Sequence, residues 1–148
     1  MASLQEVRLR FEALKGREIE FASKALTECS EQAANFMVAQ LAEGIESDGS
    51  KVSFSYAPMT IASKKNKSGL SSVTDHLTNY DTGESYRQLY EKVQGNKIIF
   101  GTTTDKEESI NQRMDGKAFG LTNDHKEEFL KQNVFPLFAK KILQFLKL

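Results

Sequence analysis

The clearest strand pattern in the chain lies near its middle, between two long stretches of helical periodicity. Residues 86–93 and 97–103 contain aromatic and β-branched side chains, and they flank Gln94-Gly95-Asn96. A short loop that contains glycine is typical of the turn between two antiparallel strands, so this segment predicts a β-hairpin. The fold must therefore place helices before and after a small antiparallel sheet.

The first 45 residues predict helices, because their apolar residues recur every three or four positions and so share one helix face. These residues are Leu4, Val7, Phe11 and Leu14, followed by Ile19, Ala22, Leu26, Cys29, Ala33 and Phe36. Gly16 either ends the first helix or weakens a longer one, since an internal glycine costs about 1 kcal/mol relative to alanine. The seam after it predicts a core-facing helix, or one that also packs on a second subunit. Cys29 lies on this seam and is predicted to be a small buried hydrophobe.

A strand pattern and a basic stretch follow the turn-rich residues 44–49. Apolar side chains alternate with serines from residue 52 to 56, which predicts a short strand that Pro58 ends. Residues 59–72 predict a flexible, solvated loop. Its lysines are Lys64, Lys65 and Lys67. The alternative for this loop is contact with DNA or with an acidic partner, although no aromatic residues are interleaved for base stacking.

The last helix is predicted to begin with Thr122 or Asn123 as its N-cap. Its most continuous apolar stripe, which we assign to the core, comprises Leu130, Val134, Phe138, Ile142 and Phe145. Phe135 and Leu146 lie beside this stripe, so they are predicted to contact another subunit. Pro136 is predicted to kink the helix, because it removes a backbone donor and clashes with the preceding turn.

These patterns predict an α+β fold in which long N-terminal and C-terminal helices pack on a small antiparallel sheet with a central hairpin. One domain over residues 1–148 is expected, with a helical part at 1–45, strands and the loop at 50–104, and a helical part at 105–148. A chain of 148 residues suits one domain, and its 39% hydrophobic content is too high for a disordered chain.

Charge and cysteine content restrict the class of protein. The 20 basic and 20 acidic residues give no net charge, which removes the electrostatic argument for a dedicated nucleic-acid binder. The single cysteine cannot form an internal disulfide. No apolar run approaches the ~18 residues of a membrane-spanning helix, and the first residues lack the build of a signal peptide. Synthesis inside the cell, without a membrane partner, is therefore expected.

Asp81-Thr82-Gly83 is predicted to form a structural turn, because Asp and Thr accept local hydrogen bonds and Gly tolerates positive φ. The same triplet occurs in aspartic proteases, where two copies bring a pair of carboxylates together. The protease alternative would need a homodimer, and the triplet would have to end an apolar strand. Here polar residues 78–79 precede it.

No other segment predicts chemistry. His76 and His125 have no cysteine or carboxylate at the spacing of metal ligands, and Asp75-His76 is a weak pair. The glycines are scattered singly rather than grouped in a phosphate-binding loop. The sequence therefore predicts a protein without catalytic residues, cofactor or metal.

Several short motifs occur in an order that resembles small neck proteins of tailed bacteriophages. They are Tyr56-Ala57-Pro58-x-Thr60, the lysine loop, Leu77-x-x-Tyr80-Asp81-Thr82-Gly83-x-x-Tyr86, Ile98-Ile99-Phe100-Gly101 and the element Phe119 to Thr122. Proteins of this type are called tail-completion, head–tail joining or virion morphogenesis proteins. The resemblance covers roughly residues 15 to 146.

The resemblance implies a non-enzymatic virion protein made in the cytoplasm of a bacterial host. Copies would form a ring at the neck or tail terminus, where their partners are portal or adaptor proteins and tail tube proteins. The lysine loop would then be able to touch DNA. The alternative from another class is a cytosolic adaptor or regulatory domain that binds one protein partner through its C-terminal helix, and an unrecognised enzyme is a third.

Overall fold

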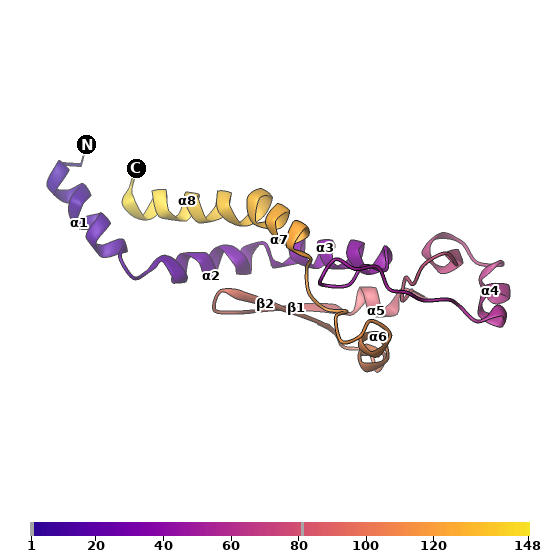
Figure 1. The fold of residues 1–148 in the computed structure, drawn as a ribbon. Coiled ribbons are helices and arrows are strands. Elements are labelled where there is room, and N and C mark those ends of the chain that lie inside the picture. Colours follow the sequence, from indigo (N-terminus) through magenta and orange to yellow (C-terminus); the bar gives the residue numbers. More distant parts are fainter. Residues whose placement is uncertain (1, 81) are drawn as a thin grey trace.

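The computed structural model describes residues 2–80 and 82–148 and has the predicted α+β class, with helices near both termini and a two-stranded antiparallel sheet (Figure 1). The molecule is long and narrow, with α1 and the C-terminus at one end and α4 at the other. The elements are α1 (Leu4–Leu14), α2 (Glu18–Glu28), α3 (Ser30–Ala42), α4 (Pro58–Lys64), η1 (Gly69–Ser72), α5 (Glu84–Arg87), β1 (Leu89–Gln94), β2 (Lys97–Thr102), α6 (Glu107–Arg113), α7 (Asn123–Phe129), η2 (Leu130–Val134) and α8 (Phe135–Leu146).

The N-terminal helices begin and end at local signals. Ser3 and Glu6 form a capping box at the start of α1, in which each side chain accepts a hydrogen bond from the other's backbone N–H. Gly16 has φ +80° and separates α1 from α2, so it ends the first helix. The predicted seam from residue 19 to 36 is not one continuous helix, because the chain leaves helical geometry at Cys29, where φ is −116° and ψ is 17°.

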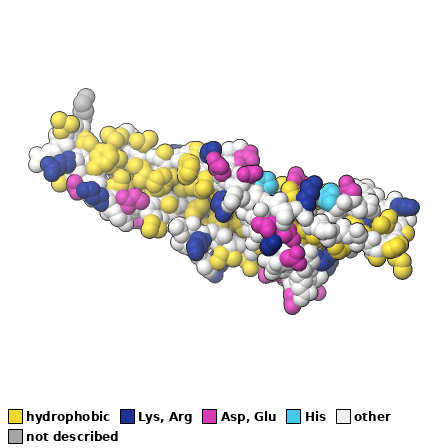
Figure 2. Space-filling view, in the orientation of Figure 1, with side chains coloured by type: hydrophobic (Ala, Val, Ile, Leu, Met, Phe, Trp, Pro, Cys, Tyr) yellow, Lys and Arg dark blue, Asp and Glu magenta, His cyan; other side chains and the backbone are white. Residues whose placement is uncertain are grey.

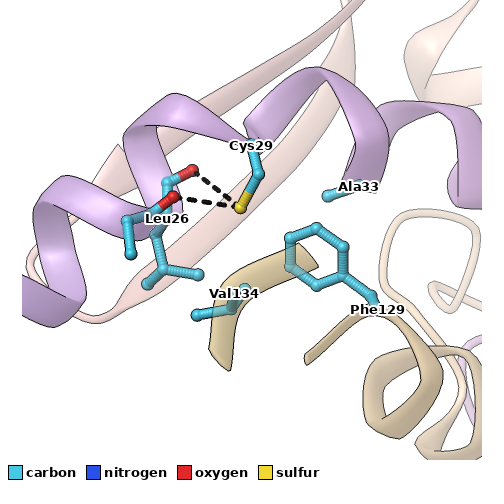
Figure 3. Packing of buried hydrophobic residues seen from close by; sticks show 6 residues of the cluster. Leu26, Cys29, Ala33, Phe129 and Val134 are labelled. Carbon is cyan, nitrogen blue, oxygen red and sulfur yellow. Dashed lines mark hydrogen bonds between the residues drawn. The ribbon is translucent and has the colours of Figure 1, made fainter. Parts of the chain in front are cut away.

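The core has two parts, and α3 contributes to both. The first part lies between α2, α3 and the C-terminal helices and contains Ala25, Leu26, Cys29, Ala33, Phe129 and Val134 (Figure 3). The second part contains Met37, Leu41, Leu77, Ile110, Met114 and Ala118. Cys29 is 3% exposed, as predicted; its thiol donates to the Ala25 carbonyl at 3.0 Å, and burial raises its pKa.

The predicted hairpin is present, but its first strand begins at Leu89 rather than at residue 86, because residues 84–87 form α5. β1 and β2 pair antiparallel with Gln94 opposite Lys97, and Gly95 at φ +60° forms the turn with Asn96. Gly101 lies opposite Tyr90, where an added Cβ would come within 2.5 Å of the tyrosine hydroxyl. β1 packs against α2 and α3, and α2 lies between the hairpin and α8 (Figure 1).

The strand predicted at residues 52–56 is absent, and this prediction was wrong. Val52, Phe54 and Tyr56 do face the second part of the core, which explains their alternation with exposed serines. Their backbone has no ladder partner, and the nearest pairing is an isolated bridge between Ile45 and Lys51. Alternating burial requires one-sided packing of an extended chain, but it does not require a neighbouring strand.

The C-terminal helix is interrupted just before the proline. Thr122 is the N-cap of α7, and its hydroxyl accepts from the His125 N–H at 3.2 Å. The π-helical segment η2 follows, and Pro136 then lies in the first turn of α8, where a missing donor costs least. The sequence predicted a kink at Pro136; the structure has a π-helical segment at residues 130–134, just before the proline. No described helix is both long enough and apolar enough to cross a membrane.

Candidate binding cleft

A cleft of about 500 Å³ opens between α4 and α6, in the half of the molecule that carries α4. One face of α4 forms its first wall, because Thr60, Ser63 and Lys64 are spaced by three and one positions. Lys67 continues this wall beyond the end of the helix. Helical geometry therefore brings two hydroxyls and Lys64 to one side of the cleft, and Lys67 joins them from the segment after the helix.

The second wall comes from α6 and its N-cap residue. Lys106, Ile110 and Arg113 are spaced by four and three positions, so they share one face of the helix. Ile110 is buried beneath this face, while Arg113 is exposed and is positioned by Ser109. The guanidinium donates to the Ser109 carbonyl at 3.1 Å and to its hydroxyl at 3.0 Å.

Residues 79–80 and 82–85 form the floor of the cleft. Gly83 has φ +80°, the positive value predicted for it, and directly precedes α5. A Cβ on Gly83 would lie 2.5 Å from the Tyr80 hydroxyl, so the ring and the turn fit only around a glycine. Thr82 also lines the floor, whereas Asp81 lies outside the described residues.

The Tyr80 ring packs edge-on against Tyr86, with centroids 5.1 Å apart. The Tyr86 hydroxyl donates to the Thr78 carbonyl, and burial, with the neighbouring Tyr56 and Tyr80, raises the pKa of Tyr86 well above its usual range. Tyr86 therefore stays protonated and supports the floor from behind.

Lys64 corrects the prediction of a flexible, solvated lysine loop. It ends α4, it is only 6% exposed, and its Nζ donates to the Ser71 carbonyl at 3.0 Å. The same Nζ lies 4.6 Å from the centroid of the Tyr56 ring, within range of a cation–π contact. The lysine is buried because Tyr56 and the short helix η1 cover it. Pro58 at the first turn of α4 is the sequence signal that identifies this helix.

The three predicted lysines therefore have different surroundings. Lys64 and Lys67 line the cleft, and they do so together with the predicted turn residues Thr82 and Gly83. Lys65 is exposed and does not line it. Sequence reasoning predicted a short polar helix from residue 105 to about 115, but it treated the lysines and the turn separately and assigned no residue of this helix to a site. The sequence places Lys106, Ile110 and Arg113 on one helix face, but only long-range packing brings that face to the cleft.

The described lining of the cleft is positively charged. Its cationic residues are Lys64, Lys67, Lys106 and Arg113, of which Lys67 already has an interaction partner, and its described carboxylate is that of Glu84. Glu84 is exposed, and its carboxylate accepts from the Gln88 amide at 3.3 Å. An excess of cationic groups around a concave site attracts anions and increases their local concentration.

The two residues predicted to contact another subunit lie in different environments. Phe135 is 53% exposed, so it is available for a contact. Leu146 is 3% exposed, and this prediction was wrong. α1 packs against α8, and Arg10 of α1 donates to the Leu146 carbonyl at 2.9 Å. α8 is covered on more than one side, because α1 packs on it as well as α2.

Both histidines have structural partners. His76 bridges the Asp75 carboxylate and the Ala42 carbonyl, each at 2.8 Å, and the Nδ1 atom of His125 lies 3.1 Å from the Gln40 side-chain oxygen. In residues 2–80 and 82–148, no group of three or more His, Cys, Asp or Glu side chains is arranged to hold a metal ion.

Comparison with protein-family models, with curated proteins and with solved structures gave no match.

Proposed function

We propose that the chain is a non-enzymatic structural protein of a tailed-phage virion, and that copies of it form a ring that joins the portal or adaptor complex to the tail. The observation that carries this proposal is an exposed apolar surface, here called the apolar end. It is formed by α1, the start of α2 and α8. Its residues are Leu4, Leu9, Phe11, Ile19, Phe135, Leu143 and Leu148.

The apolar end is concentrated rather than scattered. Its members are seven of the ten large hydrophobic residues that are exposed in the described part of the chain, and Leu4 is 90% exposed. Figure 2 shows hydrophobic side chains gathered over this end of the molecule, while charged side chains are more frequent over the other half. A grouped apolar surface of this kind is typical of a protein–protein interface.

The total exposed area also supports self-association. Monomers of 16.6 kDa expose about 7,600 Å² on average, whereas this chain exposes 9401 Å². The difference of about 1,800 Å² equals roughly two standard interface patches, since each partner in a standard interface loses about 800 Å². Every copy in a ring forms two contacts, one with each neighbour.

The motifs that carry the phage resemblance are connected in the fold. The Tyr56 hydroxyl accepts from the Thr78 N–H at 3.4 Å, and Tyr80 packs on Tyr86. The element from Phe119 to Thr122 is held to α3, because Gln40 bonds both Gly120 and Thr122. Two of the motifs, at Tyr56 and at residues 77–86, therefore contact each other in the fold.

The adaptor alternative places the partner-binding surface on the C-terminal helix alone. The apolar end instead extends from α8 over α1 and the start of α2, so three helices contribute exposed apolar residues. This distribution favours a contact that is wider than one helix. The ring therefore remains the function that we propose.

The test locates the gene and the protein, and it then changes residues of the apolar end. The gene should lie beside genes for portal and tail proteins, and mass spectrometry of purified virions should detect the chain in amounts comparable to the portal protein. The double variant Phe135→Asp and Leu143→Asp should keep the wild-type circular dichroism spectrum and should no longer enter virions, because a charge buried in each contact has no partner.

Gln144→Asp is the matched control, because Gln144 is also exposed on α8 but is polar. This control should enter virions normally. Absence of the chain from purified virions would contradict the proposed function. Normal incorporation of the double aspartate variant would instead show that the contact lies on another surface.

A further inference from the structure

We propose that the cleft between α4 and α6 is a binding site for a phosphate group. This inference goes beyond the proposed function, because a ring that joins head to tail needs no small ligand in this cleft. It rests on the charge, hydroxyl groups and burial of the residues that line the cleft.

The first observation is the buried charge of Lys64. A lysine that is 6% exposed has lost most of its hydration, and a buried ammonium is costly unless it is paired or hydrogen-bonded. In the described part of the chain, no carboxylate lies within ion-pair distance of Lys64, and the Ser71 carbonyl is its one hydrogen-bond acceptor. An ammonium has three N–H donors. An anion in the cleft would therefore complete the neutralisation of Lys64.

The second observation is that the cationic groups converge from both walls. Lys64 comes from the α4 side, and Lys106 and Arg113 come from the α6 side. Arg113 presents a planar guanidinium, which binds phosphate oxygens in pairs. A ligand between the walls would meet positive charge on both sides.

The hydroxyl groups favour phosphate over a carboxylate. Thr60 and Ser63 place two hydroxyls on the cleft face of α4, and Thr82 adds one from the floor. A phosphate group has more acceptor oxygens than a carboxylate and carries up to two negative charges, so it can accept from donors that lie on several sides. Two carboxylate oxygens cannot reach so many separate donors at once.

The phosphate group has two possible sources, which are free phosphate compounds and the backbone of nucleic acid. Both present the same oxygens to the lysines and to Arg113. The cleft is also open to solvent at exposed residues such as Thr60 and Arg113, so neither source is blocked by the surrounding chain. Competition between inorganic phosphate and an oligonucleotide therefore decides which source supplies the phosphate group.

The experiment uses the purified full chain with inorganic phosphate, and sodium chloride of equal ionic strength serves as the reference. Phosphate should raise the melting temperature in a saturable way and should shift the backbone amide NMR signals of Gly83 and Ser85. In the double variant Lys106→Gln and Arg113→Gln, the phosphate Kd should rise about tenfold or more, because two charge-assisted hydrogen bonds are lost.

Lys92→Gln with Lys97→Gln is the matched control, because both lysines are exposed on the hairpin and neither lines the cleft. This control should bind phosphate with the wild-type Kd. Lys64→Met is a further variant that keeps the length of the buried side chain, and it should stay folded but lose phosphate binding. An unchanged Kd in the Lys106 and Arg113 variant would overturn the proposal, and so would a wild-type chain that does not respond to phosphate.

Two further ligands identify the source and test the ligand class. If a ten-nucleotide single strand of thymidines competes with phosphate at the same amide signals and binds more tightly, then nucleic acid supplies the phosphate group. If the oligonucleotide does not compete, the ligand is a small phosphate compound. A glutamate-rich peptide that displaces phosphate at equal concentration would show that the cleft takes carboxylates, and the proposal would then be wrong.

Discussion

At the scale of single residues, Gly83 is limited by backbone conformation and by space. Its φ of +80° disfavours any side chain, and an added Cβ would also meet the Tyr80 hydroxyl at 2.5 Å. Gly49 has a similar φ of +88° but no atom within 4 Å of an added Cβ. Comparing the two glycines therefore separates backbone strain from steric overlap.

We predict that Gly83→Ala lowers the free energy of unfolding by ~1–3 kcal/mol, and that Gly49→Ala lowers it less. The difference between the two losses of unfolding free energy measures the cost of the contact between the added Cβ and the Tyr80 ring. Urea unfolding of both variants gives the two values. Equal losses would mean that Tyr80 moves aside without cost, and the close contact would then place no constraint on this position.

Lys64 and Lys65 are adjacent in the sequence but differ in burial. We predict that Lys64→Ala lowers the free energy of unfolding by ~1–3 kcal/mol, because it removes a hydrogen bond and a cation–π contact. Lys65→Ala should stay within ~0.5 kcal/mol of the wild type, as exposed substitutions usually do. Thermal and urea unfolding would check both values. Equal effects of the two substitutions would argue against the buried position of Lys64.

At the scale of elements, Gln40 connects α3 to the start of α7. It is fully buried, its amide donates to the Gly120 carbonyl at 2.7 Å, and its oxygen accepts from the Thr122 N–H at 3.0 Å. The side-chain oxygen also lies near His125. One glutamine therefore satisfies backbone groups at the N-terminus of a helix that lies far away in the sequence.

We predict that Gln40→Leu lowers the free energy of unfolding by ~2–4 kcal/mol, because each of two backbone groups left unpaired costs ~1–3 kcal/mol. Hydrogen exchange at Thr122 and His125 should become faster than in the wild type, since α7 loses its link to α3. Gln32→Leu on the exposed side of α3 is the control and should have little effect on stability. A stable Gln40→Leu variant with unchanged exchange would show that packing alone holds α7.

Elements with local signals could be predicted from the sequence. The Gly95 turn, the Thr122 cap and the end of α1 at Gly16 each depend on residues close in the chain. The unpaired segment at 52–56 could not be predicted, because the presence of a ladder depends on a partner strand far away. Leu146 was assigned wrongly for a similar reason, since α1, which lies far away in the sequence, packs on α8.

The cleft was predictable only in pieces. Lys67, Thr82 and Gly83 were selected from the sequence as parts of two unrelated features. These residues line one cleft only because α4 packs against the segment before α5. A short stretch of sequence cannot predict this packing, because it involves residues far apart in the chain. The contribution of Lys106 and Arg113 depends on the same long-range packing.

At the scale of the whole molecule, the two-part core along α3 explains the elongated shape (Figure 1). A compact chain of 148 residues has a radius of gyration of about 15 Å. We predict that X-ray scattering from dilute protein gives a clearly larger value. The scattering mass must equal 16.6 kDa, so that a ring or dimer does not account for the increase. A monomer with a radius near 15 Å would contradict the extended arrangement.

The π-helical segment η2 has a consequence for how this protein can diverge over evolution. Its hydrogen bonds span five residues instead of four, as between the Phe135 N–H and the Leu130 carbonyl. Deleting one residue from it would restore a regular α-helix but rotate all of α8 by about 100°. Leu146 would then leave its position beneath α1. Homologues that lack the inserted residue must therefore carry a rearranged apolar pattern in α8, so the insertion and that pattern should be inherited together.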